Sequence, residues 1–567
     1  MQHDALAHVM SAPGANIARH LGQMAALQPQ AVALKVPRGR TSAGNIDYLT
    51  LSFRELDGEV AAWCTRLDHA GVRPGDRTLV MVRQGLPLIA SVFAILNTGA
   101  VPVVIDPGMG LKSFLACVGH SRPRVLVGIP FASLISRIFR AAFRSVNVRV
   151  AAPGALTARL TAPKSAGGPP TAPFTFPSKA SDLAAILFTS GSTGTPKGVC
   201  YEHGMFEAQV RIIREAYAIQ PGEIDLPMLP IFALFNPALG MTTVVPEIDP
   251  RRPAAFDPVK IVQAIQQEKI TTSFGSPTLW SKIAAHCQAH GITLPTLRRV
   301  LCAGAAVPAT LWRQSRIFLP HGKIHSPYGA TEALPVATIA SNEIEADSVR
   351  GACVGRPLPA VEVRIIAISD EPIARIGDAQ EISSEEIGEI IVRGPNVTKS
   401  YDGLPAANRL AKISDSVPDS GASETMAQVW HRMGDCGFLD REGRLWYCGR
   451  KAERVVTSRG TLHTEPCEQV FRSHPQAGRC ALIGLGERPT QRAALVVETT
   501  VRDSTEGRQL ARELRILARE HPHTGEIKVF FFRPKFPVDV RHNAKIHRLT
   551  LAKWAQTAKG FESDPKR

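Results

Sequence analysis

The chain has 567 residues, 44% of them hydrophobic and 20% charged, which is typical of a globular protein and too long for a single hydrophobic core. Its 66 lysines and arginines outnumber its 50 aspartates and glutamates, and the net charge of +16 favours contact with a polyphosphate or an anionic surface. No aromatic–basic platform or recognition-helix motif accompanies this charge, so nucleic-acid binding is not expected.

The cysteines and the N-terminus indicate the cellular location. Ten cysteines are scattered without a Cys-x-x-Cys pair or a His/Cys cluster, which favours a reducing cytoplasm and argues against a zinc site or a disulfide framework. Residues 1–14 lack the basic start and apolar stretch of a secretion signal. The most apolar window, 86–105, is broken by prolines and a glycine, so no transmembrane segment is expected. Peripheral contact with a membrane or an acidic partner is compatible with the charge.

The first part of the chain alternates strands and helices. Residues 1–50 are predicted to be irregular, apart from a hairpin or loop over 37–45. Apolar side chains then recur every three to four positions from Phe53 to Leu67, which predicts a helix. A strand over 77–82, a helix over 86–96 and a strand over 101–105 follow. This alternation predicts an α/β fold with a parallel sheet covered on both faces.

Composition also predicts connections and a domain boundary. Residues 150–181 are rich in proline, alanine, threonine and glycine and predict a linker, and residues 402–428 predict a surface loop. After position 450 we expect strands over 454–457, 480–484, 493–498 and 528–532, and helices over 465–473 and 506–520. We therefore predict a large N-terminal domain, residues 1–449, and a small C-terminal α+β domain, residues 450–567.

An apolar run over 183–188 passes into a loop of hydroxyls and glycines closed by a lysine. The run predicts a buried strand, and the glycines let the following backbone turn tightly and point its N–H groups at an anion. With the hydroxyls and the lysine charge, the loop is a predicted triphosphate cradle, although an ordinary Ser/Thr/Gly turn is the alternative. The cradle comprises Thr189, Ser190, Gly191, Ser192, Thr193, Gly194 and Lys197.

The loop departs from a Walker A motif, because Pro196 replaces a glycine and Gly198 replaces the Ser/Thr that would bind magnesium. A P-loop phosphotransferase is therefore disfavoured. Residues 189–198, Thr-Ser-Gly-Ser-Thr-Gly-Thr-Pro-Lys-Gly, resemble the phosphate loop of the adenylate-forming superfamily, which includes acyl-CoA synthetases, peptide-synthetase adenylation domains and luciferases. The resemblance implies a large N-terminal domain of sandwiched mixed sheets and helices, and a small mobile C-terminal domain.

Two further motifs resemble nucleotide-binding segments of that superfamily. Residues 301–308 predict a strand opening into a turn of small residues, and the corresponding turn in the superfamily lines the adenine. Residues 328–332 match its Tyr-Gly-x-Thr-Glu motif, in which the tyrosine can stack on a base, the threonine can donate to a phosphate and the glutamate can hold Mg²⁺. These motifs assign Ala303, Gly304, Ala305, Tyr328 and Gly329 to nucleotide binding, Thr331 and Glu332 to catalysis, and Glu332 to the metal.

The C-terminal third carries two more motifs of the superfamily. Residues 430–440 resemble its Gly-Asp-x-Gly-x-x-Asp segment, so we predict that Asp435 accepts from the ribose hydroxyls with Arg450 assisting; a surface Asp-Gly turn is the alternative. Residues 536–548 resemble the closing motif, with Ala544 in place of its usual glycine. The resemblance implies that Lys545 bridges the carboxylate and the phosphate during adenylation, against the alternative of a solvated lysine in a basic tail.

Residues 229–241 are too apolar, and too rich in proline and glycine, for an exposed loop. We predict that Phe232, Ala233, Leu234 and Phe235 form the wall of a hydrophobic substrate pocket, with a buried crossover as the alternative. Many relatives have a histidine at the position of Ala233, so any role of that imidazole is in doubt here.

Three segments, 232–240, 327–336 and 542–548, together resemble olefin β-lactone synthetases of bacterial hydrocarbon pathways. The resemblance implies an ATP- and Mg²⁺-dependent ligase that adenylates a long-chain 2-alkyl-3-hydroxy fatty acid and closes it to a β-lactone, releasing AMP and pyrophosphate. It also implies work alongside a β-lactone decarboxylase and a 2-alkyl-3-ketoacid reductase. An AMP-forming long-chain acyl-CoA ligase, a non-catalytic nucleotide-binding protein and a P-loop phosphotransferase are the alternatives.

Overall fold

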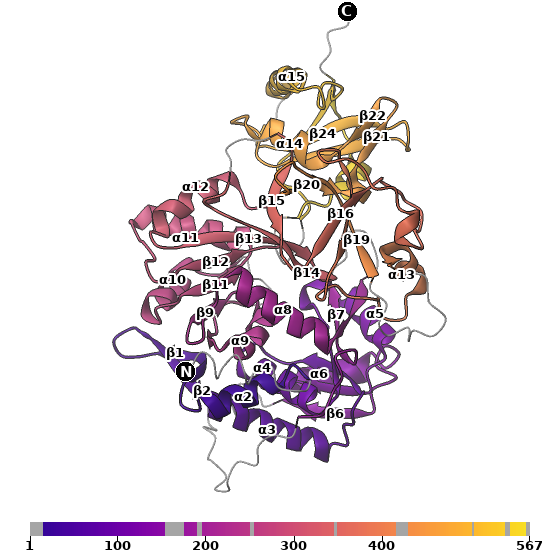
Figure 1. Cartoon of the computed structure of the whole chain (residues 1–567). Coiled ribbons are helices and arrows are strands. Elements are labelled where there is room, and N and C mark those ends of the chain that lie inside the picture. Colours follow the sequence, from indigo (N-terminus) through magenta and orange to yellow (C-terminus); the bar gives the residue numbers. More distant parts are fainter. Residues whose placement is uncertain are drawn as a thin grey trace, which may run out of the picture. The chain divides into compact units, whose positions relative to one another are not determined.

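The computed structural model describes residues 15–152, 175–189, 196–249, 255–344, 349–415, 429–501, 504–538 and 545–562 (Figure 1). The chain forms two compact units. The first comprises Met1–Pro335, Gly394–Asn408 and Pro418–Val429, and the second comprises Val336–Arg393, Arg409–Val417 and Trp430–Arg567. The predicted domain boundary between residues 449 and 450 is not tested by this division and stays a prediction.

The first unit contains a six-stranded sheet with the strand order β6-β5-β3-β4-β7-β8. All neighbouring strands are parallel except β7 and β8, which form an antiparallel pair. The strands are β3 (Arg77–Met81), β4 (Val101–Ile105), β5 (Val125–Gly128), β6 (Val148–Ala151), β7 (Leu183–Thr189) and β8 (Lys197–Glu202). The predicted strands over 77–82, 101–105 and 183–188 are therefore confirmed.

A second sheet, which has 14 strands among the described residues, contributes seven strands to this unit in the order β13-β12-β11-β9-β10-β1-β2. These seven strands pair in parallel except for the β1–β2 hairpin. They are β1 (Val32–Arg40), β2 (Ile46–Ser52), β9 (Ile224–Pro227), β10 (Thr242–Val244), β11 (Thr272–Gly275), β12 (Arg299–Cys302) and β13 (Lys323–Ala330).

Helices cover both faces of each sheet in the first unit. The apolar core between the sheets takes side chains from α3 (Phe53–His69), α4 (Leu86–Asn97) and α8 (His203–Ala216). Helices α5 (Leu111–Ser121) and α6 (Pro130–Ile138) cover the outer face of the six-stranded sheet, and α10 (Pro258–Gln267), α11 (Pro277–His290) and α12 (Ala309–Phe318) cover that of the other sheet. Figure 1 shows these layers, which confirm the predicted α/β class of sandwiched sheets and helices.

Local sequence explains the start and the buried face of α3. Ser52 accepts a hydrogen bond from the Glu55 amide while the Glu55 carboxylate accepts one from the Ser52 amide, which is a complete capping box. The predicted helical stripe is buried, including Phe53 and Trp63. The prediction that residues 1–50 are irregular was wrong, because α2 (Arg19–Leu27), β1 and most of β2 lie there, whereas the hairpin or loop predicted over 37–45 is confirmed as part of the antiparallel β1–β2 hairpin. The parallel partner of β1 is β10, about 200 residues away, so local sequence gave little sign of that strand.

The second unit is built on antiparallel strands of the 14-stranded sheet, in the order β16-β17-β19-β20-β15-β14, with β18 beside β19. The strands are β14 (Ala333–Ala340), β15 (Ala352–Pro357), β16 (Glu362–Ile366), β17 (Gly388–Arg393), β18 (Lys412–Ser414), β19 (Val429–Leu439) and β20 (Leu445–Arg450). The surface loop predicted over 402–428 was wrong in part, because α13 (Pro405–Ala411) and β18 lie in it; residues 416–428 lie outside the described residues.

The remainder of the second unit holds a hairpin and a four-stranded sheet, β23-β24-β25-β26. Helices α14 (Thr464–Arg472) and α15 (Ser504–Glu520) pack on one face of that sheet, and α16 (Arg548–Ala555) packs on the other. The strands are β21 (Val455–Thr457), β22 (Gly460–Leu462), β23 (Cys480–Leu485), β24 (Arg492–Glu498), β25 (Val529–Arg533) and β26 (Phe561–Glu562). The elements predicted after residue 450 are confirmed to within about two residues at each end.

Within the described parts of the chain, each helix is too short or too polar to cross a lipid bilayer.

Candidate functional site

The predicted phosphate loop connects two antiparallel strands. Thr189 at the end of β7 is the register partner of Lys197 at the start of β8. The loop residues Ser190, Gly191, Ser192, Thr193 and Gly194 lie outside the described residues, as does the side chain of Thr189. A Walker A loop instead opens a helix, so the strand–loop–strand order removes the P-loop phosphotransferase from the alternatives.

Gly198 is required by packing within this hairpin. A Cβ atom at this position would lie 2.8 Å from Cζ of Phe188 and 3.0 Å from Cγ2 of Ile186. Phe188 and Ile186 are buried in the core beneath α5 and α6. The glycine after the lysine therefore lets β8 lie flat against the apolar strand that leads into the loop.

A segment distant in sequence lies alongside β8 and brings Tyr401 to the lysine. The Cys200 amide donates to the Ser400 carbonyl at 3.1 Å, and the Asp402 amide donates to the Gly198 carbonyl at 2.8 Å. Nζ of Lys197 consequently lies 4.7 Å from the centroid of the Tyr401 ring, within cation–π range.

The same tyrosine reaches the predicted metal ligand. The Tyr401 hydroxyl donates to Oε1 of Glu332 at 2.8 Å. The Glu332 carbonyl accepts from the amide and the hydroxyl of Thr398, at 2.8 and 3.1 Å. Next to Glu332, the Thr331 carbonyl accepts a short hydrogen bond from the Tyr201 hydroxyl on β8. The structure thus brings together Lys197, Thr331 and Glu332, and the two tyrosines that join them were missed by sequence reasoning.

The base-binding candidates lie along one edge of the second sheet. Strands β11, β12 and β13 are parallel, so their carboxyl ends share an edge, where Ala303, Gly304 and Ala305 follow β12. Tyr328 and Gly329 lie on β13, which runs to Ala330. Packing requires a glycine at position 329, since a Cβ there would lie 2.5 Å from the Ala333 carbonyl oxygen.

The predicted pocket wall adjoins these candidates. Phe232 stacks on Phe274 with ring centroids 3.7 Å apart, in a cluster that also contains Leu229 and Ala303. Ala233 is buried, and Leu234 packs against the core between the sheets. The wall lies partly in that core, so the pocket and the buried crossover both fit it and the pocket stays a prediction.

Phe235 links the wall to the catalytic candidates. It packs edge-on against Phe206 at 6.2 Å, and Phe206 stacks on Tyr201 at 4.8 Å. Tyr201 is the residue bonded to the Thr331 carbonyl. A continuous aromatic row therefore runs from the predicted acyl wall to the Thr331–Glu332 segment.

A buried polar group fixes the end of the wall. The Asn236 amide donates to Oδ2 of Asp225 at 2.9 Å and to the Thr243 hydroxyl at 2.8 Å. Burial raises the pKa of Asp225 to about 7. Its Oδ1 is buried and has no hydrogen-bond partner among the described residues, which agrees with a carboxyl held in its neutral form. Asn236 follows the apolar run directly, a position that sequence reasoning passed over.

The ribose candidates pair across two strands of the second unit. Asp435 on β19 is the register partner of Arg450 on β20, and Nη1 of Arg450 lies 2.9 Å from Oδ1 of Asp435. Asp435 is buried within a strand, so the alternative of a surface Asp-Gly turn was wrong. A Cβ at Gly449 would lie 2.1 Å from the Thr464 hydroxyl, so this glycine is also fixed by packing.

Ion pairs hold the segment that follows Arg450. Buried Glu389 receives two hydrogen bonds from Arg432, at 2.6 and 3.0 Å, and lies 3.0 Å from Nζ of Lys451. The same lysine donates to the Ser369 carbonyl at 2.7 Å. The start of the predicted C-terminal domain is therefore anchored to β17 and β19 of its own unit.

Lys545 is followed closely by two anchored residues, Ile546 and Arg548. Ile546 is buried and pairs with Val538, and Arg548 donates to both carboxylate oxygens of Glu468 at 2.7 and 2.8 Å. Nη1 of Arg548 also lies 3.0 Å from Oε2 of Glu453. Lys545 itself is only half-buried. Residue 544, at the position of the motif glycine, lies outside the described residues.

The donor set agrees with a magnesium ion that arrives with a nucleotide. Mg²⁺ is commonly held by one or two carboxylates together with substrate phosphates. Glu332 offers one carboxylate oriented by Tyr401, and within the described residues no three His, Cys, Asp or Glu side chains form a metal cluster. Glu332 would hold the ion, which when bound would neutralise phosphate charge.

The candidates form two sets, one in each compact unit. The first set contains Lys197, Thr331, Glu332, Tyr328 and the small-residue turn, and the second contains Asp435, Arg450 and Lys545. That both sets meet at one ATP molecule stays a prediction.

Comparisons with known proteins agree with this reading. The family model described as "AMP-binding enzyme" matches residues 23–402. The olefin β-lactone synthetase of Stenotrophomonas maltophilia (strain K279a) is 41% identical over 554 residues, covering 95% of this chain and 98% of that protein. The olefin β-lactone synthetase of Xanthomonas campestris pv. campestris is 40% identical over 553 residues, covering 95% and 97%.

A solved structure shows the same fold. O-succinylbenzoate coenzyme A synthetase from Bacillus subtilis, in complex with ATP and magnesium ion, matches with a TM-score of 0.71 at 20% identity, covering 94% of this chain and 98% of that one. At this identity the likeness concerns the fold.

Proposed function

The chain belongs to the AMP-binding enzyme family, and from this premise we propose that it is a ligase that activates a long-chain 2-alkyl-3-hydroxy fatty acid with ATP and closes it to a β-lactone. The observation that carries the proposal is the 41% identity to an olefin β-lactone synthetase over 95% of the chain. The aromatic row between the apolar wall and the Thr331–Glu332 segment supports an acyl substrate.

The first step makes the carboxylate a usable electrophile. A carboxylate oxygen attacks the α-phosphorus of ATP, the bond to the β-phosphate oxygen breaks, and pyrophosphate leaves with the electron pair. Lys197 would neutralise the departing phosphates, Glu332 would orient Mg²⁺, and Lys545 would balance charge at the new bond. Positioning and fixed charge are the main sources of rate acceleration in such a transfer.

The second step needs no external acceptor. The 3-hydroxyl oxygen of the bound acyl adenylate attacks the carbonyl carbon and loses its proton, the bond to the AMP oxygen breaks, and AMP leaves. A four-membered lactone is formed. Because the nucleophile belongs to the substrate, the reaction requires no thiol and no channel for coenzyme A.

Product identification separates this function from its nearest rival. Purified protein would be incubated with ATP, Mg²⁺ and a 2-alkyl-3-hydroxy acid, with and without coenzyme A, and the products analysed by mass spectrometry. We expect lactone and AMP in both reactions. Acyl-CoA as the main product would assign an acyl-CoA ligase instead. ATP–pyrophosphate exchange dependent on the acid would exclude a non-catalytic nucleotide-binding protein.

Neighbouring enzymes follow from the chemistry of substrate and product. A 2-alkyl-3-ketoacid reductase would supply the hydroxy acid, and a β-lactone decarboxylase would consume the lactone. Adding each purified enzyme to the assay tests this proposal: the reductase should allow the keto acid to replace the hydroxy acid, and the decarboxylase should convert the lactone to an olefin.

A further inference from the structure

Helix α6 presents an apolar stripe to solvent. Its inner side is buried at Ala132 and Ser136, against the core beneath the six-stranded sheet. Phe131, Leu134 and Ile138 remain 61%, 53% and 62% exposed. These positions follow the i, i+3, i+7 spacing that places side chains on one face of a helix.

This stripe is unusual for a surface helix of a globular protein. Single exposed apolar side chains are ordinary, but a contiguous apolar face generally marks an interaction site. Three large apolar side chains, each more than half exposed, lie within the nine residues of α6. Helix α6 thus has an inner face packed against the core and an outer apolar stripe that is uncovered in the described structure.

The stripe lies in the most basic part of the chain. Between Asp106 and Asp182 the sequence contains ten lysines and arginines and no acidic residue, which accounts for ten of the sixteen net positive charges. Arg137, Arg140 and Arg144 are exposed on α6 or directly after it. Among the described residues, no carboxylate lies within 4.0 Å of these three guanidinium groups.

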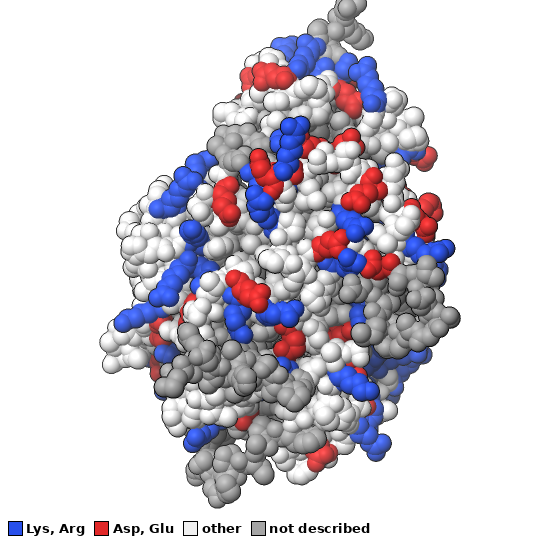
Figure 2. All heavy atoms as spheres, viewed as in Figure 1, with Lys and Arg blue, Asp and Glu red and all other residues white. Residues whose placement is uncertain are grey.

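A fourth arginine is fixed against the helix. Nε of Arg149 on β6 donates to the Ser136 hydroxyl of α6 at 3.0 Å. Figure 2 shows basic side chains gathered along the lower right-hand edge of the molecule, on the side where Figure 1 places α6 and β6. Exposed apolar side chains flanked by unneutralised arginines are typical of helices that lie in a membrane interface.

We propose that α6 and the arginines around it dock onto the surface of an anionic lipid bilayer. Phe131, Leu134 and Ile138 enter the boundary between headgroups and acyl chains, and the guanidinium groups contact lipid phosphates. A short helix with three apolar anchors gives reversible binding rather than permanent insertion. The location suits a protein whose proposed substrate carries long alkyl chains, but the docking itself does not depend on the lactone chemistry.

Vesicle binding tests the proposal directly. The full-length protein would be mixed with vesicles of phosphatidylcholine alone or of equal parts phosphatidylcholine and phosphatidylglycerol, and bound protein measured by flotation. We expect binding to the anionic vesicles, weakening as salt is added, and little binding to the neutral ones. Equal binding to both, or none to the anionic vesicles, would overturn the proposal.

Two variants locate the surface. Replacing Arg137, Arg140 and Arg144 by glutamine should lower the partition coefficient about fivefold for each charge removed. The variant F131S/L134S/I138S should lower it by on the order of tenfold or more, since the apolar anchors are lost. Unchanged binding in both variants would overturn the assignment to α6.

Helix α12 of the same unit provides the matched control. Arg313, Arg316 and Ile317 are exposed there, so R313Q/R316Q/I317S removes similar groups from another face and should leave vesicle binding unchanged. Circular dichroism and ATP–pyrophosphate exchange should be unaltered in all variants, because none of these residues belongs to the candidate site. If the stripe is instead covered by a second copy, the serine variant will change the mass in solution without affecting vesicle binding, and the proposal fails.

Discussion

Tyr401 donates its hydroxyl hydrogen to Oε1 of Glu332 at 2.8 Å, while its ring lies 4.7 Å from Nζ of Lys197. The tyrosine is 4% exposed and is held by backbone pairing with β8. One side chain therefore orients both the predicted phosphate lysine and the predicted magnesium ligand, which are more than 130 residues apart in the sequence.

We expect Tyr401→Phe to keep the ring beneath Lys197 but lose the hydrogen bond to Glu332. A hydrogen bond to a charged group contributes about 1.5–3 kcal/mol, so ATP–pyrophosphate exchange should fall roughly 10- to 100-fold at low Mg²⁺ and recover in part as Mg²⁺ is raised. Tyr401→Leu also removes the ring and should be worse. Mg²⁺-dependent ATP binding, followed by calorimetry, should weaken in parallel. Tyr217→Phe, a change at another buried tyrosine of the first unit, should have neither effect.

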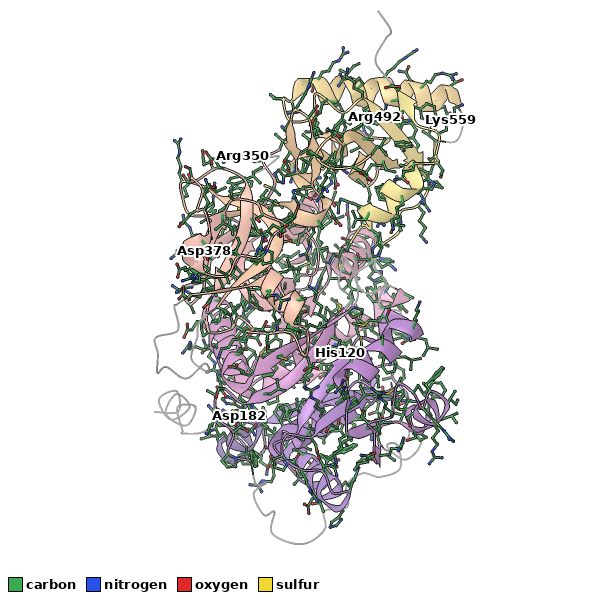
Figure 3. The ribbon with its side chains drawn as sticks, turned by 90° about the vertical axis from the view of Figure 1, so that its right-hand side faces the viewer. His120, Asp182, Arg350, Asp378, Arg492 and Lys559 are labelled. Atoms are coloured by element: carbon green, nitrogen blue, oxygen red, sulfur yellow. The ribbon has the colours of Figure 1, made fainter. Side chains whose placement is uncertain are left out.

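Lys545→Ala should slow adenylation strongly while leaving the fold intact. Removing one donor that stabilises a developing charge typically costs about 2.7–4 kcal/mol, or about a hundred- to a thousandfold in rate. Closure of a chemically prepared 3-hydroxyacyl adenylate to lactone and AMP should be much less affected. Lys559→Ala, at an exposed lysine of the same unit labelled in Figure 3, is the control. If Lys559→Ala slows adenylation as much as Lys545→Ala does, Lys545 is not part of the candidate site.

Asp435→Asn should weaken ATP binding. The amide can accept only through one oxygen and cannot balance the charge of Arg450, so the KM for ATP should rise by about tenfold or more. Asp440→Asn is a suitable comparison because Asp440 is also buried, where it accepts hydrogen bonds from Arg444 and Trp446. Both variants should be less stable, but an increase in KM limited to Asp435→Asn is the result that identifies the ribose ligand.

Buried His203 predicts a stability change in mild acid. Burial lowers the pKa of His203 from 6.5 to about 4, and its Nδ1 accepts from the Ile17 amide. Between pH 4 and pH 6.5 the folded state therefore binds fewer protons than the unfolded state. The stability that comes from burying neutral His203 is present above pH 6.5 and is lost as the pH falls toward 4. At about 1.4 kcal/mol per pKa unit the loss is roughly 3 kcal/mol.

The test compares pH profiles rather than single values. Free energies of unfolding would be measured by urea denaturation from pH 7 to pH 4 for the wild type and His203→Gln. The variant should lose less stability across this window, since glutamine does not titrate. If the free energy of unfolding falls equally with pH in the wild type and in His203→Gln, protonation of His203 does not destabilise the folded state.

Much of this architecture follows from local sequence. The stripe from Phe53 to Leu67 gave α3 because each member faces the core, and the apolar run 183–188 gave β7 because it is buried between neighbouring strands. Motifs selected Lys197, Glu332 and Asp435 as candidates, and the first two both contact Tyr401, Lys197 over its ring and Glu332 at its hydroxyl.

The features missed depend on contacts between distant segments. Tyr401 gained its position by pairing with β8, whose residues precede it by about 200 positions. Asp402 lies in the predicted surface loop but is buried, and its Oδ1 lies 2.7 Å from Nη2 of Arg77. Its backbone carbonyl accepts a hydrogen bond from the ring of His120, which Figure 3 labels. The hydrophobic pattern of residues 398–402 does not indicate these contacts with distant segments.

The guanidinium group of Arg548 joins Glu468 of α14 to Glu453, three residues beyond Arg450, and stands three residues after Lys545. Side-chain ion pairs therefore tie the segment that carries Lys545 to the residues that follow Arg450 within the second unit. Loss of these ion pairs would keep Lys545 itself but would release its segment from Glu453 and Glu468.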